Sequence, residues 1–174
     1  MDEVLAIGST PYWWMLGLLA FARAMDFLST WVATPNLTLE ANPIARLLGW
    51  KWGALVNAVL CVLAAQWPLA AVVLITTSLL VAARNFKSAW FMRALGEDRY
   101  RALAGELMEA SSGRLILVCV SGETLLFALI GAAVVFFGRH ELVIVAIGIG
   151  FVAYAGAVAF YTALGVWRAR RSIR

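Results

Sequence analysis

Long apolar runs alternate with short polar connections along the chain, and the runs predict five membrane-spanning helices. Several runs approach the ~20 residues that a helix needs to cross the hydrocarbon of a bilayer, whereas buried helices of soluble proteins are shorter. The predicted spans cover residues 12–33, 51–66, 69–83, 115–137 and 142–166. The pattern therefore predicts an all-α fold, in which residues 1–174 form a single polytopic membrane domain.

The tryptophans support these boundaries, because all of them lie at or near the ends of the apolar runs. Indole rings gather at the level of the lipid headgroups, where one edge of the ring can be wet. The residues concerned are Trp13, Trp14, Trp31, Trp50, Trp52, Trp67, Trp90 and Trp167. They mark the two water boundaries of a bilayer.

Two connections carry structure of their own. Asn42-Pro43 has the form of a helix N-cap followed by proline at the first helical position, and it predicts a short helix over residues 44–50 before the second span. Residues 96–113 space Tyr100, Leu103 and Leu107 among charges, as in an amphipathic helix. We expect this segment to lie on the membrane surface or on the inner ends of the spans; a helix that docks a partner is the alternative.

The basic residues predict an orientation with the N-terminus outside and the C-terminus in the cytoplasm. This arrangement puts twelve of the 14 lysines and arginines inside, as the positive-inside rule requires. They are Arg46, Lys51, Arg84, Lys87, Arg93, Arg99, Arg101, Arg114, Arg168, Arg170, Arg171 and Arg174. The amphipathic segment 96–113 would then be cytoplasmic.

Composition excludes several classes of protein. The chain is 63% hydrophobic and 14% charged, whereas a soluble domain carries roughly 25% charge. The net charge of +4 does not indicate nucleic acid, since the basic residues lie between apolar runs and not along one face. A lone His140 offers no histidine-based metal motif, and Cys61 and Cys119 are expected to be buried free thiols. Cofactors and metals stay open at this stage.

Three charged residues fall inside predicted spans, where each costs about 2.5–3.5 kcal/mol on insertion scales. They are Arg23, Asp26 and Glu123. Arg23 can pair with Asp26, three residues further along the same helix face, or with Glu123 from the fourth span. If Arg23 does not neutralise Glu123, that carboxyl is protonated or binds a cation.

Asp26, Ser29 and Thr30 also share a face, and oxygens at this density suit a hard cation or a proton relay. Alternatively, the two hydroxyls bond back to their own helix carbonyls. Counting residues from the membrane surface brings other polar side chains to similar depths, and this predicts a polar cavity open toward the cytoplasm. These side chains are Asn57, Ser78, Tyr154 and Tyr161, with Glu40 and Asn42 at the mouth of the cavity.

The first three spans resemble a group of small prokaryotic integral membrane proteins of unknown function. The resemblance rests on Asp26-x-x-Ser29-Thr30 in the first span and on Glu40-x-Asn42-Pro43 before the second, and it covers about residues 20–90. It implies residence in the inner membrane of a prokaryote. It also points to Asp26, Thr30, Glu40, Asn42 and Pro43, without implying an activity.

Three functions fit these residues. The first is a cation or proton channel or transporter, with Asp26 and Glu123 as titrating or coordinating groups and Arg23 tuning them. The second is a non-catalytic subunit of a larger membrane complex, in which the polar groups pair with partner helices. The third is a metal-dependent enzyme acting on lipid headgroups, with Asp26 and Glu40 holding the metal. We expect a transporter rather than an enzyme, assembled as a homo-oligomer or with partner membrane subunits.

Overall fold

The computed structural model of the protein describes residues 4–172, which fold into six helices without a strand among them. The helices are α1 (Thr10–Ala33), α2 (Pro43–Ala64), α3 (Pro68–Leu95), α4 (Glu97–Ala110), α5 (Gly113–Phe137) and α6 (Leu142–Ser172). All except α4 are long and apolar enough to cross a membrane, so the structure contains the five long apolar helices that the sequence predicts. Arg174 lies outside the described residues, and the side chains of Arg168, Arg170 and Arg171 are not described.

Helices α1, α2 and α5 begin where short polar side chains satisfy free backbone N–H groups, whereas α3 and α4 have no side-chain cap. The side chain of Ser9 accepts from the Tyr12 N–H, and that of Ser112 accepts from the Leu115 N–H. Asn42 Oδ1 accepts from the Ile44 N–H at 3.0 Å, and Pro43 follows as the first helical residue. The predicted Asn42-Pro43 start is therefore confirmed.

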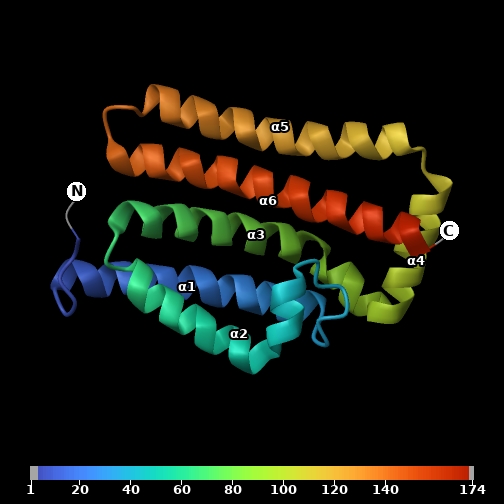
Figure 1. Cartoon of the computed structure of the whole chain (residues 1–174), viewed down its shortest axis with the longest axis horizontal. Coiled ribbons are helices and arrows are strands. Elements are labelled where there is room, and N and C mark those ends of the chain that lie inside the picture. The colour runs from blue at the N-terminus through green and yellow to red at the C-terminus, as the bar shows by residue number, and fades with distance from the viewer. Residues whose placement is uncertain (1–3, 173–174) are drawn as a thin grey trace.

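The long helices run alongside one another, with α3 between α1 and α6 and with α5 on the far side of α6 (Figure 1). The pair α5–α6 approaches closely at Gly131 and Gly148. A Cβ added to Gly131 would lie 2.7 Å from the carbonyl oxygen of Gly148, so only glycine allows this approach. In contrast, α2 packs against α1 and α3 only lightly.

A break at Gly49 divides α2 into two parts. Gly49 has φ 62° and ψ −171°, a backbone conformation that side chains other than glycine rarely adopt. The predicted short helix over 44–50 and the following span therefore exist, with the break one residue before the predicted boundary. The break sets the first turns of α2 at an angle to the rest of the helix.

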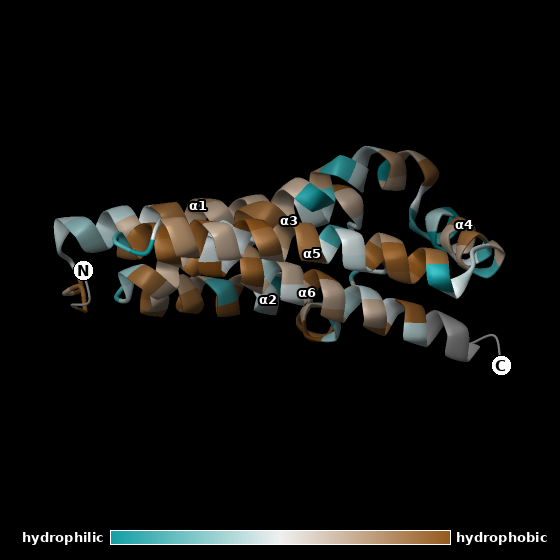
Figure 2. Cartoon of the chain, turned by 90° about the horizontal axis from the view of Figure 1, so that it is seen from above, coloured by the Kyte–Doolittle hydropathy of each residue, from teal (hydrophilic) through white to brown (hydrophobic). Residues whose placement is uncertain are grey.

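Buried apolar side chains tie α1, α2 and α3 together near the α2–α3 turn. This cluster contains Tyr12, Leu19, Cys61, Ala64, Ala65 and Ala71. The Tyr12 hydroxyl also donates to the Val62 carbonyl at 3.2 Å. Many large apolar side chains of the long helices are exposed, and Figure 2 shows apolar residues along most of the length of these helices.

One expectation about these helices was wrong. The helix of the third span was expected to continue past residue 83 through residues 84–87, and α3 runs as one helix further still, to Leu95. Cys119 was expected to be buried, but it is exposed, because α5 packs on α6 along one side and presents the rest of its surface outward.

The amphipathic segment forms α4, slightly inside the predicted limits of 96–113. The ring of Tyr100 packs edge-on against Phe91 of α3, with the ring centres 6.0 Å apart. Leu107, on the same predicted stripe, is 59% exposed. The apolar side of α4 is therefore only partly covered by the rest of the chain.

Candidate functional site

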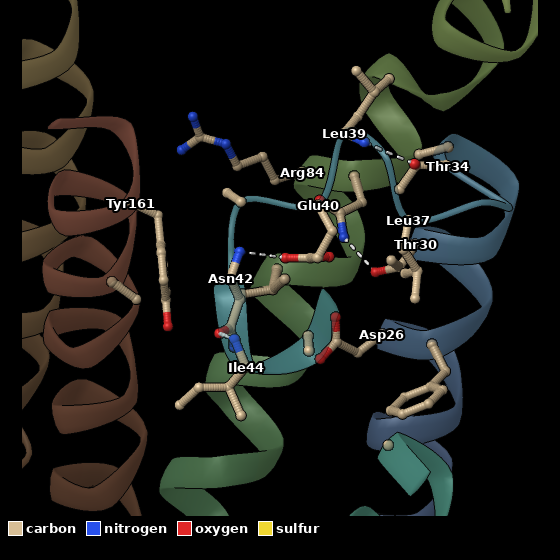
Figure 3. Close-up of a pocket in the computed structure, with 18 of the residues that line it drawn as sticks. Asp26, Thr30, Thr34, Leu37, Leu39, Glu40, Asn42, Ile44, Arg84 and Tyr161 are labelled. Atoms are coloured by element: carbon tan, nitrogen blue, oxygen red, sulfur yellow. Dashed lines mark hydrogen bonds between the residues drawn. The ribbon is translucent and has the colours of Figure 1, made fainter. Parts of the chain in front are cut away.

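A partly open cavity of about 600 Å³ lies where α1, α2, α3 and α6 meet the connection 34–42 (Figure 3). Figure 3 shows Asp26, Glu40 and Asn42 pointing into the same space, with Tyr161 facing them from α6. The polar side chains in the lining are Arg23, Asp26, Thr30, Thr34, Glu40, Asn42, Asn57, Arg84, Asn85, Ser88, Tyr154, Tyr161 and Thr162. Sequence reasoning predicted a polar cavity open toward the cytoplasm; of the side chains predicted for it, Asn57, Tyr154 and Tyr161 line this cavity, whereas Ser78 does not.

Arg23 joins three helices at the end of this cavity that is farthest from the connection 34–42. One guanidinium nitrogen, Nη1, lies 2.8 Å from Asp26 Oδ2 and 2.9 Å from the hydroxyl of Ser78 on α3. The Nε–H of Arg23 donates to Asn57 Oδ1 on α2 at 2.7 Å. Arg23 therefore pairs with Asp26, and the alternative pairing with Glu123 is wrong.

Glu123 pairs instead with Arg84, whose Nη1 lies 2.9 Å from Glu123 Oε1. The Glu123 side chain is 40% exposed and is not part of the cavity lining. Sequence reasoning missed this pair because it ended the third span near residue 83 and counted Arg84 as a surface residue. The expectation that Glu123 would be an unneutralised acid at the site was wrong.

The hydroxyls beside Asp26 have partners within the protein. Ser29 is buried, and its hydroxyl donates to the Asp26 carbonyl at 2.8 Å, which is the back-bonding that the sequence left open. Asn85 of α3 donates to the hydroxyls of Ser29 and Thr30 at 3.3 and 3.2 Å. Thr30 lines the cavity, whereas Ser29 does not. Asn85 lies two turns after Ser78, and this spacing could have placed both on the face of α3 that meets α1.

The connection 34–42 brings Glu40 and Asn42 over the cavity. Glu40 Oε1 accepts from the Asn42 N–H at 2.8 Å, and Thr34 Oγ1 accepts from the Leu39 N–H at 3.1 Å. The ion pairs among the described residues are Arg23–Asp26 and Arg84–Glu123. Within that part of the chain, Glu40 is therefore a cavity carboxylate that no cationic side chain pairs with.

Helix α4 holds this connection in place. The Glu97 carboxylate accepts from the N–H groups of Asn36 and Thr38 at 2.8 and 3.1 Å, and also from the Thr38 hydroxyl. Arg101 donates to the Thr38 carbonyl at 2.5 Å. The sequence predicted the helix but not these contacts. Glu97 and Arg101 bind mainly backbone groups, which nearly every residue has, so the residue types do not reveal the pairing. A charge on α4 thus positions the segment that carries Glu40.

Helix α6 supplies the aromatic wall of the cavity. Tyr154 is buried and packs its ring against Phe127 of α5, with the ring centres 4.9 Å apart. Tyr161 lies two turns further along and also lines the cavity. Both tyrosines were predicted to lie at the depth of the site, and their places in the lining agree with that.

The site offers few ligands to a metal ion. No group of three His, Cys, Asp or Glu side chains in residues 4–172 could hold one. The acidic side chains of the lining are Asp26 and Glu40, and Asp26 is already paired with Arg23. A site built mainly from carboxylates is therefore not present in the described chain.

Comparison with protein-family models, with curated proteins and with solved structures finds no match to this chain.

Proposed function

We propose that this chain is a multi-pass membrane protein that binds a cation, or a proton, in the cavity and carries it across the bilayer. The observation that carries the proposal is the charge of the lining. Asp26 offsets Arg23, and Glu123 offsets Arg84 from outside the cavity, so Glu40 remains as a negative charge without a cationic side chain. A carboxylate in such surroundings gains most from a bound cation or proton.

The surroundings of Glu40 suit a cationic ligand. Asp26 uses one carboxylate oxygen, Oδ2, for Arg23, and its side chain lines the same cavity as Thr30 and Tyr161. These oxygens can replace part of the water around an entering cation. The exchange of water for fixed oxygens is what allows a charge to enter a membrane protein at low cost.

A carrier fits better than an open pore. The cavity lies at the end of the bundle that holds the connection 34–42, while the apolar cluster around Tyr12, Leu19 and Ala71 fills the opposite end of α1, α2 and α3. A cation bound at Glu40 would therefore need a rearrangement of the helices before it left on the other side. Light packing of α2 makes that helix the element best able to move.

The proposal includes an orientation. The positive-inside rule favours an external N-terminus and a cytoplasmic C-terminus, and α4 with its charges then lies on the cytoplasmic side. The mouth of the cavity would face the cytoplasm. The resemblance of the Asp26 and Glu40 motifs to small prokaryotic membrane proteins supports the inner membrane of a prokaryote as the location.

Flux in liposomes tests this function. The purified chain is reconstituted with a pH-sensitive dye inside the vesicles, and proton, Na⁺ and K⁺ gradients are applied in turn. We expect a flux that Glu40→Gln and Asp26→Asn each reduce at least tenfold. Glu141→Gln, an exposed carboxylate in the α5–α6 turn, serves as the matched control and keeps the flux. Equal flux in Glu40→Gln and the unaltered chain would contradict the proposal.

A second candidate, a subunit of a homo-oligomer or of a larger membrane complex, is favoured by one observation. The Arg84 and Glu123 side chains pair within spanning helices yet are 37% and 40% exposed, and charges exposed to lipid are costly. A neighbouring protein helix over this pair would remove that cost. Cross-linking in native membranes from Cys119, which is exposed one turn before Glu123, would detect such a neighbour. An enzyme acting on lipid headgroups ranks third, because no third His, Cys, Asp or Glu in residues 4–172 joins Asp26 and Glu40 in a group that could hold a metal ion.

A further inference from the structure

One side of the cavity lies between two helices that do not pack closely on each other. Helices α2 and α6 both line it, yet they do not pack against each other as α1 does with α3 or α3 with α6. The buried cluster holds α2 near its C-terminal end, around Cys61 and Ala64, and the break at Gly49 turns its first part. Ile44 of α2 and Tyr161 of α6 stand on either side of this opening (Figure 3). In the proposed membrane orientation this gap would face the hydrocarbon, and a molecule dissolved in the membrane would reach the site without passing through water.

The walls beside this opening are apolar. They include Leu48 and Val56 of α2 and Ala157 and Val158 of α6, while the charged side chains of the lining lie on α1, on α3 and on the connection 34–42. A proton or a metal ion gains nothing from aliphatic walls. An amphiphile gains from both parts, because its chain contacts the walls while its head reaches the polar groups. The cavity volume of about 600 Å³ lies within the range of sites for small organic ligands.

The polar end also suits an ammonium better than a metal ion. Hard metal cations take six or more oxygen ligands, usually with several carboxylates, whereas an ammonium has three N–H donors to satisfy. Glu40, the second oxygen of Asp26 and a neutral oxygen such as the Thr30 hydroxyl supply three acceptors. Arg84, on the α3 wall, uses Nη1 for Glu123 and has other N–H groups that suit a phosphate.

These observations point to one class of ligand. We infer that the cation bound in this cavity is the ammonium head of an aminophospholipid, which enters from the bilayer between α2 and α6. The inference rests on the proposed function and specifies its substrate. Glu40 holds the ammonium, Arg84 faces the phosphate, and the acyl chains lie along Leu48 and Val158 toward the lipid.

Lipid retention in native mass spectrometry tests the inference. The full chain, purified in detergent, is mixed with equal amounts of phosphatidylethanolamine and phosphatidylglycerol carrying identical acyl chains. We expect at least a fivefold preference for the ethanolamine lipid. Glu40→Gln should remove the preference, and Glu141→Gln should keep it. Free ethanolamine, which has the same ammonium without the chains, should fail to displace the lipid at a hundredfold excess.

A second variant tests the route of entry. Ala157→Trp fills the α6 wall of the opening and should abolish lipid retention, while Ala153→Trp, on an exposed position of the same helix outside the lining, should not. Symmetrical elution on size exclusion checks that each variant is folded.

The outcomes separate the two proposals. Equal retention of both lipids, or displacement by free ethanolamine, together with a Glu40-dependent flux of small cations, overturns the lipid inference and leaves the proposed function standing. Equal retention without any Glu40-dependent flux overturns both.

Discussion

Nε of Arg23 lies 2.7 Å from Oδ1 of Asn57, and this hydrogen bond ties α1 to α2 inside the membrane region. Beside this bond, Phe27 of α1 packs edge-on against Trp50 of α2, with the ring centres 6.0 Å apart, while the buried cluster that joins the helices lies further toward the α2–α3 turn. The position of α2, and with it the shape of the cavity, therefore depends on this polar contact together with an aromatic one.

Asn57→Ala should loosen α2. A hydrogen bond to a charged group contributes about 1–2 kcal/mol in such a setting, so unfolding in mixed micelles of sodium dodecyl sulfate should show a loss of this size. Thr124→Val is the control, because the Thr124 hydroxyl bonds only to carbonyls of its own helix. An equal effect of the two substitutions would show that the Arg23–Asn57 contact does not hold α2.

Gly49→Ala should destabilise the protein through backbone strain. The φ of 62° costs a residue with a Cβ about 1–2 kcal/mol, although a Cβ there would meet no atom within 4 Å. Gly17→Ala in α1 also finds open space, in ordinary helical backbone, and should be neutral or stabilising. Equal unfolding free energies for both variants in the same micelle assay would argue against a fixed break in α2.

Removing one charge of the Arg84–Glu123 pair should destabilise the protein more than removing both. Glu123→Gln leaves Arg84 without its partner in a spanning helix and should cost about 1–2 kcal/mol, less than for a fully buried pair because both side chains are partly exposed. The double variant Arg84→Met with Glu123→Met removes both charges and should recover most of that loss. Double-variant stability at or below that of Glu123→Gln would contradict this.

Glu97→Gln should release the connection 34–42 from α4. A neutral amide accepts hydrogen bonds more weakly than a carboxylate and cannot serve the N–H groups of Asn36 and Thr38 equally well. Amide hydrogen exchange over residues 36–40 should rise at least fivefold, while Glu106→Gln, exposed on the same helix, should leave it unchanged. Unchanged exchange in Glu97→Gln would mean that α4 does not position Glu40.

Much of the fold could be predicted from the sequence, because long apolar runs determine membrane helices almost alone. Contacts within one helix or one turn were also accessible, such as Arg23 with Asp26 and the Asn42 cap. Pairs between helices were not, because the apolar pattern of a membrane helix does not reveal which way each face turns. Arg84 with Glu123 and Asn85 with Thr30 depend on how α3 is rotated and on its extension to Leu95.

The same limit applies to the candidate site. Most of the predicted residues do line one cavity, because they lie at similar depths on α1, α2 and α6 and on the connection 34–42. Glu123 was misplaced because depth alone cannot distinguish the inside of a bundle from its surface. The hydrogen bonds that Glu97 accepts from backbone N–H groups could not be predicted, because they do not depend on the residue types of their donors.

The most direct test of the account is an infrared difference spectrum of the reconstituted protein with and without the bound cation, supplied either as Na⁺ or K⁺ in the buffer or as phosphatidylethanolamine in the bilayer. If Glu40 binds the cation, its addition should change a carboxylate stretching band, and the change should vanish in Glu40→Gln and persist in Glu141→Gln. A cation-induced carboxylate change that is identical in Glu40→Gln, or the absence of any such change in the unaltered protein, would contradict the account.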